Sequence, residues 1–165
     1  MSISASFYTA DICDAHGSAV RTTKPVFSNY GRRSAFCGPV RTLRVFEDNS
    51  LVKEVLASDG GGAVLIVDGG GSTRCALLGG NLAELASRNN WAGLIINGCI
   101  RDVHEINTCD IGVRALAACP RKSKKHGAGE RDVELKFAGA DFRPGEYVYC
   151  DLDGVIVAAG ELSGS

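Results

Sequence analysis

Two apolar runs near the centre of the chain indicate buried strands. Residues 63–67 (AVLIV) and 92–96 (AGLII) contain no polar side chain, which is typical of strands that are covered on both faces of a parallel sheet. Between them, residues 82–90 are predicted to form a helix, with Asn81 as its N-cap and Glu84 completing a capping box. A strand, a helix and a second strand in this order favour a right-handed parallel crossover.

Shorter elements are predicted on both sides of this unit. We expect helices at residues 9–16 and 49–58, strands at 35–46 and 111–118, and a short helix or turn at 101–106. From residue 133 to residue 157 the pattern is typical of strands separated by turns at Gly139, Gly145 and Gly154. The predicted fold is a layered α/β arrangement with a mixed sheet, and one domain is expected to cover residues 1–165.

Charge and hydropathy exclude several classes of protein. The net charge is −1, so no long-range field draws the chain to nucleic acid or to an anionic membrane, and we expect neither partner. The longest uncharged apolar run, residues 91–100, is interrupted by Asn97 and Gly98 and is much shorter than the roughly 20 residues that span a bilayer. No basic segment followed by an apolar one resembles a signal peptide, so we expect a cytoplasmic protein.

The cysteines do not form a metal-binding or disulfide pattern. There are seven, an odd number, and no C-x-x-C pair is present, so we expect buried free thiols rather than a zinc site. Cys99 and Cys109 lie near the candidate site described next, but neither has an evident paired histidine that would activate it as a nucleophile. The three histidines have no spacing that indicates a shared metal.

Glycine is over-represented, with 21 residues in 165, against a usual share of about 7%. Its clusters follow the predicted strands: residues 69–71 and 79–80 come after the first apolar run, and Gly98 comes after the second. Ligands of open α/β sheets bind beyond the carboxyl ends of the strands. We therefore expect the segments 68–81 and 97–102 to meet there.

The first of these segments ends in Gly79, Gly80, Asn81 and Leu82, at the start of the predicted helix. Backbone N–H groups at a helix N-terminus bind a carboxylate or a phosphate, and the helix dipole strengthens the interaction. The alternative is an ordinary glycine turn closed by an asparagine cap. The segment is neither a Walker A loop nor a G-x-G-x-x-G fingerprint.

The second segment ends in Arg101 and Asp102, a cation beside a carboxylate. The arginine can hold a substrate carboxylate at two points, and the aspartate can hold Mg²⁺ together with waters and substrate oxygens. The alternative is a surface ion pair.

Residues 121–126 (RKSKKH) form a basic run, for which a solvated loop is favoured over contact with a phosphate or an acidic partner.

Seven segments in one order resemble the RraA-like family, which unites the regulator of ribonuclease E activity A with class II 4-hydroxy-4-methyl-2-oxoglutarate aldolases. They are TADICDA (9–15), PVFSNYGRRSAFCGPV (25–40), VFEDN (45–49), VLIVDGGGSTRCALLGGN (64–81), WAGLIINGCIRD (91–102), DIGVRALAACP (110–120) and YCDLDGVIVA (149–158). The resemblance implies an α/β/α layered fold with a swivelling-domain-like core and a ring-shaped homotrimer, sometimes a hexamer, with active sites between subunits. Family members have also carried the name demethylmenaquinone methyltransferase, but the chain has no methyl-donor motif.

The resemblance also assigns roles within the two segments. It implies that the backbone of Gly79–Leu82 binds a pyruvate-like carboxylate, that Arg101 binds substrate, and that Asp102 anchors Mg²⁺ or Mn²⁺. The implied reaction is retro-aldol cleavage of 4-hydroxy-4-methyl-2-oxoglutarate, or a related 4-hydroxy-2-oxo acid, with oxaloacetate decarboxylation as a side activity. A base must also take the C4 hydroxyl proton. We expect a water held by the metal or a carboxylate. Asp68 is a candidate for a supporting role behind the direct ligands, and Glu47 and Glu161 are candidate acidic contributors, with no motif to decide between them.

The family allows a second function. Its regulators inhibit ribonuclease E by protein contact, without catalysis, and can lack the aspartate that follows the arginine. The retained pairs Gly79-Gly80 and Arg101-Asp102 favour a working metal site, whereas FSNYGRR (27–33) and VFEDN (45–49) stay close to the regulator branch. A ribonuclease partner therefore remains an alternative.

Overall fold

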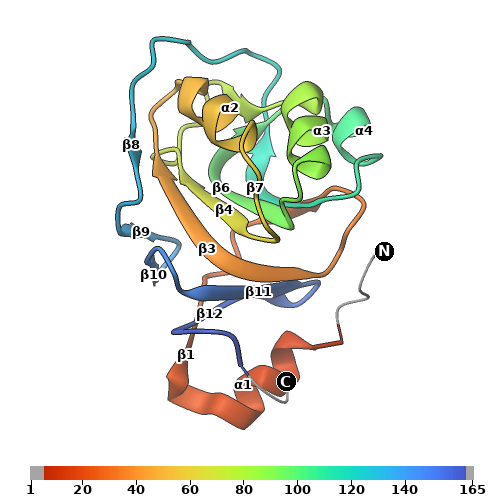
Figure 1. The fold of residues 1–165 in the computed structure, drawn as a ribbon, viewed down its shortest axis with the longest axis vertical. Helices are drawn as coiled ribbons and strands as arrows, with labels where there is room; N and C mark the ends of the chain where they lie inside the picture. The colour runs from red at the N-terminus through yellow and green to blue at the C-terminus, as the bar shows by residue number, and fades with distance from the viewer. Residues whose placement is uncertain (1–5, 163–165) are drawn as a thin grey trace.

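One mixed sheet of ten strands organises residues 6–162, the part of the chain that the computed structural model describes (Figure 1). In order across the sheet, its main strands are β1 (Val20–Thr22), β12 (Gly154–Ala158), β11 (Tyr147–Asp151), β3 (Phe36–Arg44), β4 (Val64–Asp68), β6 (Gly93–Ile100), β7 (Gly112–Ala118) and β2 (Ser28–Tyr30). Two short strands flank this path, β5 (Ala76–Leu78) beside β6 and β8 (Glu130–Arg131) beside β3. β9 (Leu135–Phe137) and β10 (Ala140–Phe142) form a separate hairpin.

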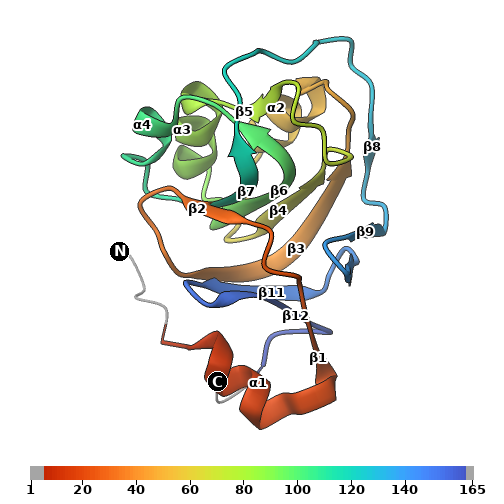
Figure 2. The ribbon, with the colours of Figure 1, turned by 180° about the vertical axis from the view of Figure 1, so that it is seen from behind.

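Helices lie at both ends of the molecule (Figure 1). Those in the described residues are α1 (Thr9–His16), α2 (Ser50–Leu56), α3 (Gly80–Arg88) and α4 (Val103–Ile106), with a 3-10 turn at Gly17–Ala19. α2, α3 and α4 cover one face of the strands β3, β4, β6 and β7, whereas α1 packs beyond β11 and β12 at the other end of the molecule (Figures 1 and 2). The predicted layered α/β fold with a mixed sheet is therefore confirmed.

The continuous apolar runs are explained by two cores, one on each face of the parallel strands. β3, β4, β6 and β7 run parallel, and Val64, Leu65, Ile66 and Val67 are all fully buried. Leu65 and Val67 face the core beneath the helices, with residues of α2 and α3. Val64 and Ile66 face the second core, which the β9–β10 hairpin and β11 complete. Because both faces are covered, the strand needs no polar alternation.

α1 is fixed to the sheet by one buried carboxylate. Asp151, at the end of β11, accepts hydrogen bonds from the backbone N–H of Thr9 at 2.7 Å and from its hydroxyl at 2.6 Å. Ile12 and Phe7 then pack against Tyr149 in a third, smaller core. The helix predicted over residues 9–16 is confirmed at these bounds.

Two of the predicted boundaries that are wrong lie next to the candidate site. The helix predicted to start at residue 82 starts at Gly80, with Gly79 as its N-cap, so Asn81 is not the cap and no capping box with Glu84 forms. The strand predicted over 92–96 continues to Ile100, because β6 extends past the end of β4 and pairs there with β5 and β7. The short strands β1, β2, β5 and β8 were not predicted.

The helices are short compared with the thickness of a bilayer. None in the described part of the chain combines the length and the apolar character that crossing a membrane requires.

Candidate functional site

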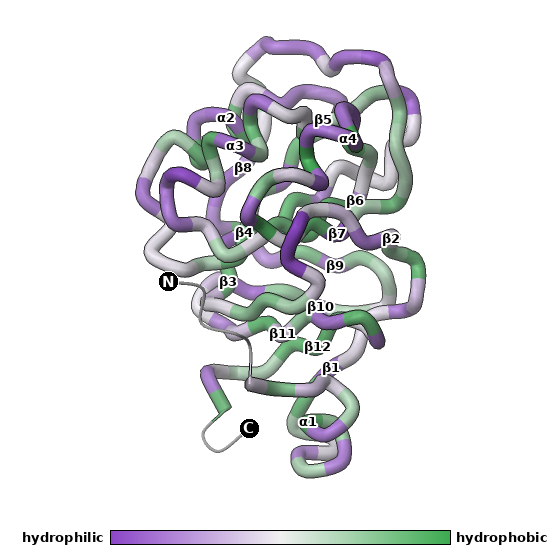
Figure 3. Tube along the Cα trace, turned by 90° about the vertical axis from the view of Figure 1, so that its right-hand side faces the viewer, coloured by the Kyte–Doolittle hydropathy of each residue, from purple (hydrophilic) through white to green (hydrophobic). Residues whose placement is uncertain are grey.

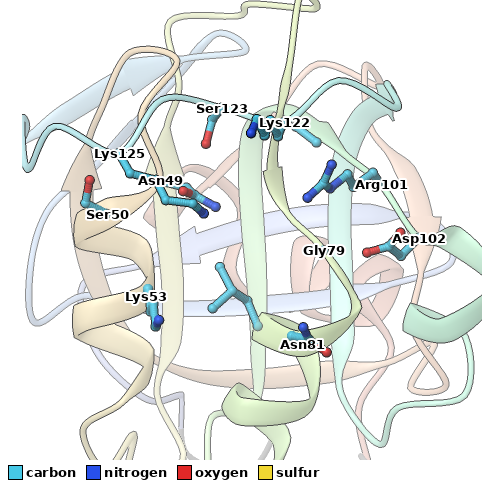
Figure 4. Close-up of a pocket in the computed structure, with 12 residues that line it drawn as sticks. Asn49, Ser50, Lys53, Gly79, Asn81, Arg101, Asp102, Lys122, Ser123 and Lys125 are labelled. Atoms are coloured by element: carbon cyan, nitrogen blue, oxygen red, sulfur yellow. The ribbon is translucent and has the colours of Figure 1, made fainter.

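A pocket of about 330 Å³ opens at the carboxyl edge of the parallel strands (Figure 4). Its walls come from four segments: the start of α2, the end of β5 with the start of α3, the turn after β6, and a stretch of the chain after β7. Strands that run parallel end at the same edge, so residues far apart in the sequence meet there. The expected convergence of Gly79–Leu82 with Arg101 and Asp102 is found in this pocket.

The turn after β6 is joined to the start of α3 by hydrogen bonds. The backbone N–H of Gly80 donates to Asp102 Oδ2 at 3.0 Å, and the backbone N–H of Arg101 donates to the Leu78 carbonyl at 2.9 Å. Asp102 adopts a left-handed backbone conformation, with φ of 56°. This conformation turns the chain out of β6 and into α4, and it directs the carboxylate toward Gly79 (Figure 4).

Both glycines are required by the closeness of these segments. A Cβ atom on Gly79 would lie 2.8 Å from Asp102 Oδ2, and one on Gly80 would lie 2.1 Å from Glu105 Oε2 and 2.9 Å from Glu105 Cβ. The glycine pair therefore does more than form a turn, because it lets Asp102 and Glu105 of α4 approach the start of α3 closely.

The start of α3 retains donors for an anion. The first N–H groups of a helix have no acceptor within the helix, and Asp102 accepts only that of Gly80. The N–H groups of Asn81 and Leu82 follow in the first turn, and both residues line the pocket. The helix dipole adds positive potential at this end.

Arg101 and Asp102 do not form the ion pair that we considered as an alternative. No salt bridge among the described residues joins them. The half-buried Arg101 side chain instead donates a long hydrogen bond of 3.4 Å to the Pro120 carbonyl, and its guanidinium extends into the pocket (Figure 4). Four of its five N–H groups thus have no partner among the described residues, and the side chain lines the pocket.

The donor set at this pocket fits a magnesium ion better than a zinc ion. Nowhere in residues 6–162 do three or more His, Cys, Asp or Glu side chains gather as a metal site, and Asp102 is the carboxylate in the pocket lining. Mg²⁺ is commonly held by one or two carboxylates, with waters and substrate oxygens completing the shell. Asp102 Oδ1, which makes no hydrogen bond in the described residues, fits that role.

The basic run contributes to the pocket, so it is not simply a solvated loop. Lys122, Ser123 and Lys125 line the pocket together with Lys53 from α2. The chain after β7 crosses the top of the molecule as a hydrophilic segment (Figures 1 and 3). Lys53, Asn49 and Ser50 were not predicted as site residues, because no local motif indicates that the start of α2 faces this edge.

Backbone pairing holds the basic run in place. The N–H of Ala76 donates to the Arg121 carbonyl at 2.8 Å, the N–H of Lys124 to the Glu47 carbonyl at 2.8 Å, and the N–H of Asn49 to the Lys124 carbonyl at 3.2 Å. These bonds connect the segment to β5 on one side and to the start of α2 on the other.

Asp48 is the side chain that secures this connection. It is only 3% exposed, and its carboxylate accepts hydrogen bonds from the backbone N–H groups of Ser50 at 2.9 Å, His126 at 2.8 Å and Ala128 at 3.3 Å, and from the Ser50 hydroxyl. Burial opposes the charge, but the hydrogen bonds outweigh it and lower the Asp48 pKa to about 2.

The other acidic candidates lie away from the pocket. Asp68 Oδ1 accepts hydrogen bonds from the Gly70 N–H and from Asn97. Glu47 is paired with Arg74 at 2.6 Å and Ser72, and Glu161 lies beside Cys37 and Tyr147, near the opposite end of the sheet. None of the three lines the pocket in the protomer.

The remaining candidates are also absent from the pocket lining. The glycine cluster at 69–71 hydrogen-bonds to the Asn97 carbonyl through the N–H groups of Gly69 and Gly71 instead of joining the site. Cys99 is 1% exposed, and burial raises its pKa and that of Cys109, which disfavours either thiol as a nucleophile. All seven cysteines are unpaired, and Cys75, Cys99 and Cys150 are buried.

The family model described as "RraA-like: Aldolase/RraA" matches residues 9–157. The chain belongs to the RraA-like family. The resemblance inferred from its sequence segments is thus confirmed.

Proteins that are similar to the chain carry different names. A Cupriavidus taiwanensis protein named "Putative 4-hydroxy-4-methyl-2-oxoglutarate aldolase" is 53% identical, over 93% of this chain and 96% of its own length. The crystal structure of a Geobacillus kaustophilus S-adenosylmethionine: 2-dimethylmenaquinone methyltransferase is 49% identical, covers 96% of this chain and 99% of its own, and superposes with a TM-score of 0.94. The RNA-processing inhibitor RraA from Thermus thermophilis is 47% identical, covers 96% of each chain, and superposes with a TM-score of 0.93.

The Asp48 connection leads to a testable dependence of stability on pH. A carboxyl whose pKa is lowered from 3.8 to about 2 stabilises the folded state above pH 4, and this contribution is lost as the pH falls toward 2. We expect Asp48→Asn to lower the free energy of unfolding by about 2 kcal/mol at pH 7, with a smaller deficit at pH 2.5. Urea denaturation at both pH values measures this.

A matched control for this experiment is Asp59→Asn. Asp59 accepts a similar hydrogen bond from the Gly61 N–H at 3.0 Å, but in an exposed turn, so the change should cost less than about 0.5 kcal/mol. Equal losses in the two variants at pH 7 would contradict the role given to Asp48.

Proposed function

We propose that the protein is a class II aldolase of the cytoplasm that cleaves 4-hydroxy-4-methyl-2-oxoglutarate, or a related 4-hydroxy-2-oxo acid, to pyruvate. The observation that carries the proposal is the arrangement of Arg101 and Asp102 beside the first turn of α3. This arrangement puts a cation, a free carboxylate oxygen and helix N–H groups around one space. The names of relatives that are more than half identical to the chain support the same activity.

In this proposal the 2-oxo acid end of the substrate binds at α3. Its carboxylate accepts hydrogen bonds from the N–H groups of Asn81 and Leu82, where the helix dipole favours a negative charge. Arg101 lies within the same pocket and places its positive charge where the enolate oxygen develops. Asp102 would hold Mg²⁺ or Mn²⁺, which when bound supplies Lewis-acid polarisation of the keto group.

The cleavage breaks the C3–C4 bond. The C4 hydroxyl loses its proton, C4 becomes the carbonyl carbon of one product, and the bonding electron pair moves to C3 to give the enolate of pyruvate. Protonation at C3 completes the second product. The same enolate follows loss of carbon dioxide from oxaloacetate, so we expect decarboxylation of that acid as a side activity.

The proton acceptor is proposed to be a water held at Asp102. No histidine lines the pocket in the protomer, and Asp68, Glu47 and Glu161 lie outside it. We also propose the homotrimer or hexamer that is typical of the family, in which a neighbouring subunit borders the open side of the pocket.

The first test removes the proposed metal anchor. We expect Asp102→Ala to lower Mg²⁺-dependent pyruvate release by at least about 100-fold, because metal-ion catalysis contributes several kcal/mol to the barrier. Asp102→Asn should lose activity to a similar extent while keeping an acceptor for the Gly80 N–H. Pyruvate release from 4-hydroxy-4-methyl-2-oxoglutarate and from oxaloacetate measures both.

Asp153→Ala serves as the control, because Asp153 is exposed on the β11–β12 turn at the other end of the sheet. Circular dichroism should show folded protein for every variant. Unchanged turnover in folded Asp102→Ala would refute the metal-site assignment, and a wild-type protein that releases no pyruvate would refute the aldolase.

The second candidate function is regulation of a ribonuclease by protein contact. It is favoured by the 47% identity to an RNA-processing inhibitor over nearly the whole chain. A regulator should inhibit RNA cleavage by a ribonuclease E-type enzyme equally well as wild type and as Asp102→Ala, because inhibition needs no metal site. If neither protein slows cleavage or binds the ribonuclease in a pull-down, the regulator function is excluded.

A further inference from the structure

We propose that Lys122, Ser123 and Lys125 form a second anion subsite, which binds the distal carboxylate of the substrate and makes the enzyme selective for 2-oxo diacids over 2-oxo monoacids. The inference rests on the proposed function, because it takes the 2-oxo acid end of the substrate to be bound at Arg101 and α3. It adds a role for the basic segment, which the reaction itself does not use.

The buried hydroxyl of Ser123 is the observation that points to a ligand. Ser123 is only 6% exposed, and its Oγ is the buried side-chain polar atom that lacks a hydrogen-bond partner within residues 6–162. It lines the pocket, and its oxygen is directed into the pocket interior (Figure 4). A buried hydroxyl without a partner costs about 1–3 kcal/mol, and an anion in the pocket would remove that cost by accepting its hydrogen bond.

The charge of the pocket favours a ligand with more than one negative group. Lys53, Arg101, Lys122 and Lys125 line it, against the single carboxylate of Asp102. A 2-oxo monoacid brings one negative charge, which Arg101 and the start of α3 can bind. The lysines would then face no anion, and a divalent cation at Asp102 would increase the excess of positive charge.

The two groups of donors occupy different walls. Asn81 and Asp102 lie on the wall formed by α3 and the turn after β6, whereas Ser123 lies on the opposite wall beside Asn49 (Figure 4). A ligand with an anionic group at each end can therefore contact both. The backbone bonds from Ala76, Lys124 and Asn49 hold the second wall before any ligand binds, which reduces the entropic cost of binding.

The test compares two 2-oxo acids that this reaction cannot cleave. Pyruvate has one carboxylate, and 2-oxoglutarate has two but lacks the C4 hydroxyl from which the retro-aldol step starts. Each is titrated into the wild-type protein with Mg²⁺ in a calorimeter. We expect 2-oxoglutarate to bind at least 10-fold more tightly than pyruvate.

Neutral variants of the lysines should remove this preference. We expect Lys122→Gln and Lys125→Gln each to weaken 2-oxoglutarate binding about 5- to 10-fold and to change pyruvate binding less than 2-fold. Lys124→Gln is the matched control, since Lys124 belongs to the same basic run and does not line the pocket. It should change neither affinity.

Ser123→Ala should stabilise the free protein but weaken its binding of 2-oxoglutarate. Removing the unpartnered hydroxyl should raise the midpoint of thermal unfolding of the free protein by about 2–4 °C, while 2-oxoglutarate binding weakens several-fold. A purely structural serine would lower the midpoint instead and leave the ratio of the two affinities unchanged, which would overturn the subsite.

Failure of the subsite and failure of the proposed function give different results. If both acids bind with equal affinity, the subsite is wrong and the aldolase proposal stands. If neither acid binds in the presence of Mg²⁺, both the subsite and the aldolase proposal are wrong.

Inorganic phosphate provides the last comparison. If phosphate binds more tightly than 2-oxoglutarate, and Lys122→Gln and Lys125→Gln abolish phosphate binding, the subsite takes phosphate rather than a carboxylate.

Discussion

The hydrogen bond from the Gly80 N–H to Asp102 is the interaction on which the candidate site depends. It joins the end of one parallel strand to the start of the helix that follows another, and the two segments are 22 residues apart in sequence. It directs Asp102 Oδ2 to the helix and leaves Oδ1 and the Arg101 guanidinium for ligands. A Cβ atom on Gly79 would crowd this carboxylate and one on Gly80 would crowd Glu105, so the glycine pair follows from the close approach of the two segments.

The sequence predicts the interior of this protein better than its edges. Residues 64–67 are recognisable as a strand because both of their faces contact apolar cores, and that requirement leaves no freedom at any position. The start of α3 is not predictable in the same way. Its first N–H is satisfied by Asp102, a residue from another segment, so the local pattern with Asn81 and Glu84 points to a boundary that the folded chain does not use.

The basic run at residues 121–126 also could not be assigned to the site from its local sequence. Read locally, residues 121–126 are a charged loop, and nothing in their order indicates a pocket. Their position follows from backbone pairing with Ala76 and Glu47 and from the buried carboxylate of Asp48. Arg101, Asp102 and the glycine pair could be identified because they directly follow strands. Lys53 and Ser123 could not, because tertiary contacts alone bring them to the same edge.

The left-handed backbone of Asp102 has a consequence for how this fold can change its activity. Asparagine and glycine adopt this conformation more readily than most residues, so either can replace the aspartate with little backbone strain. The carboxylate could thus disappear in a single substitution while the turn into α4 and the surface of the protein persist. A chain with this turn can therefore lose the proposed metal anchor in one substitution and still keep the surfaces that contact other molecules.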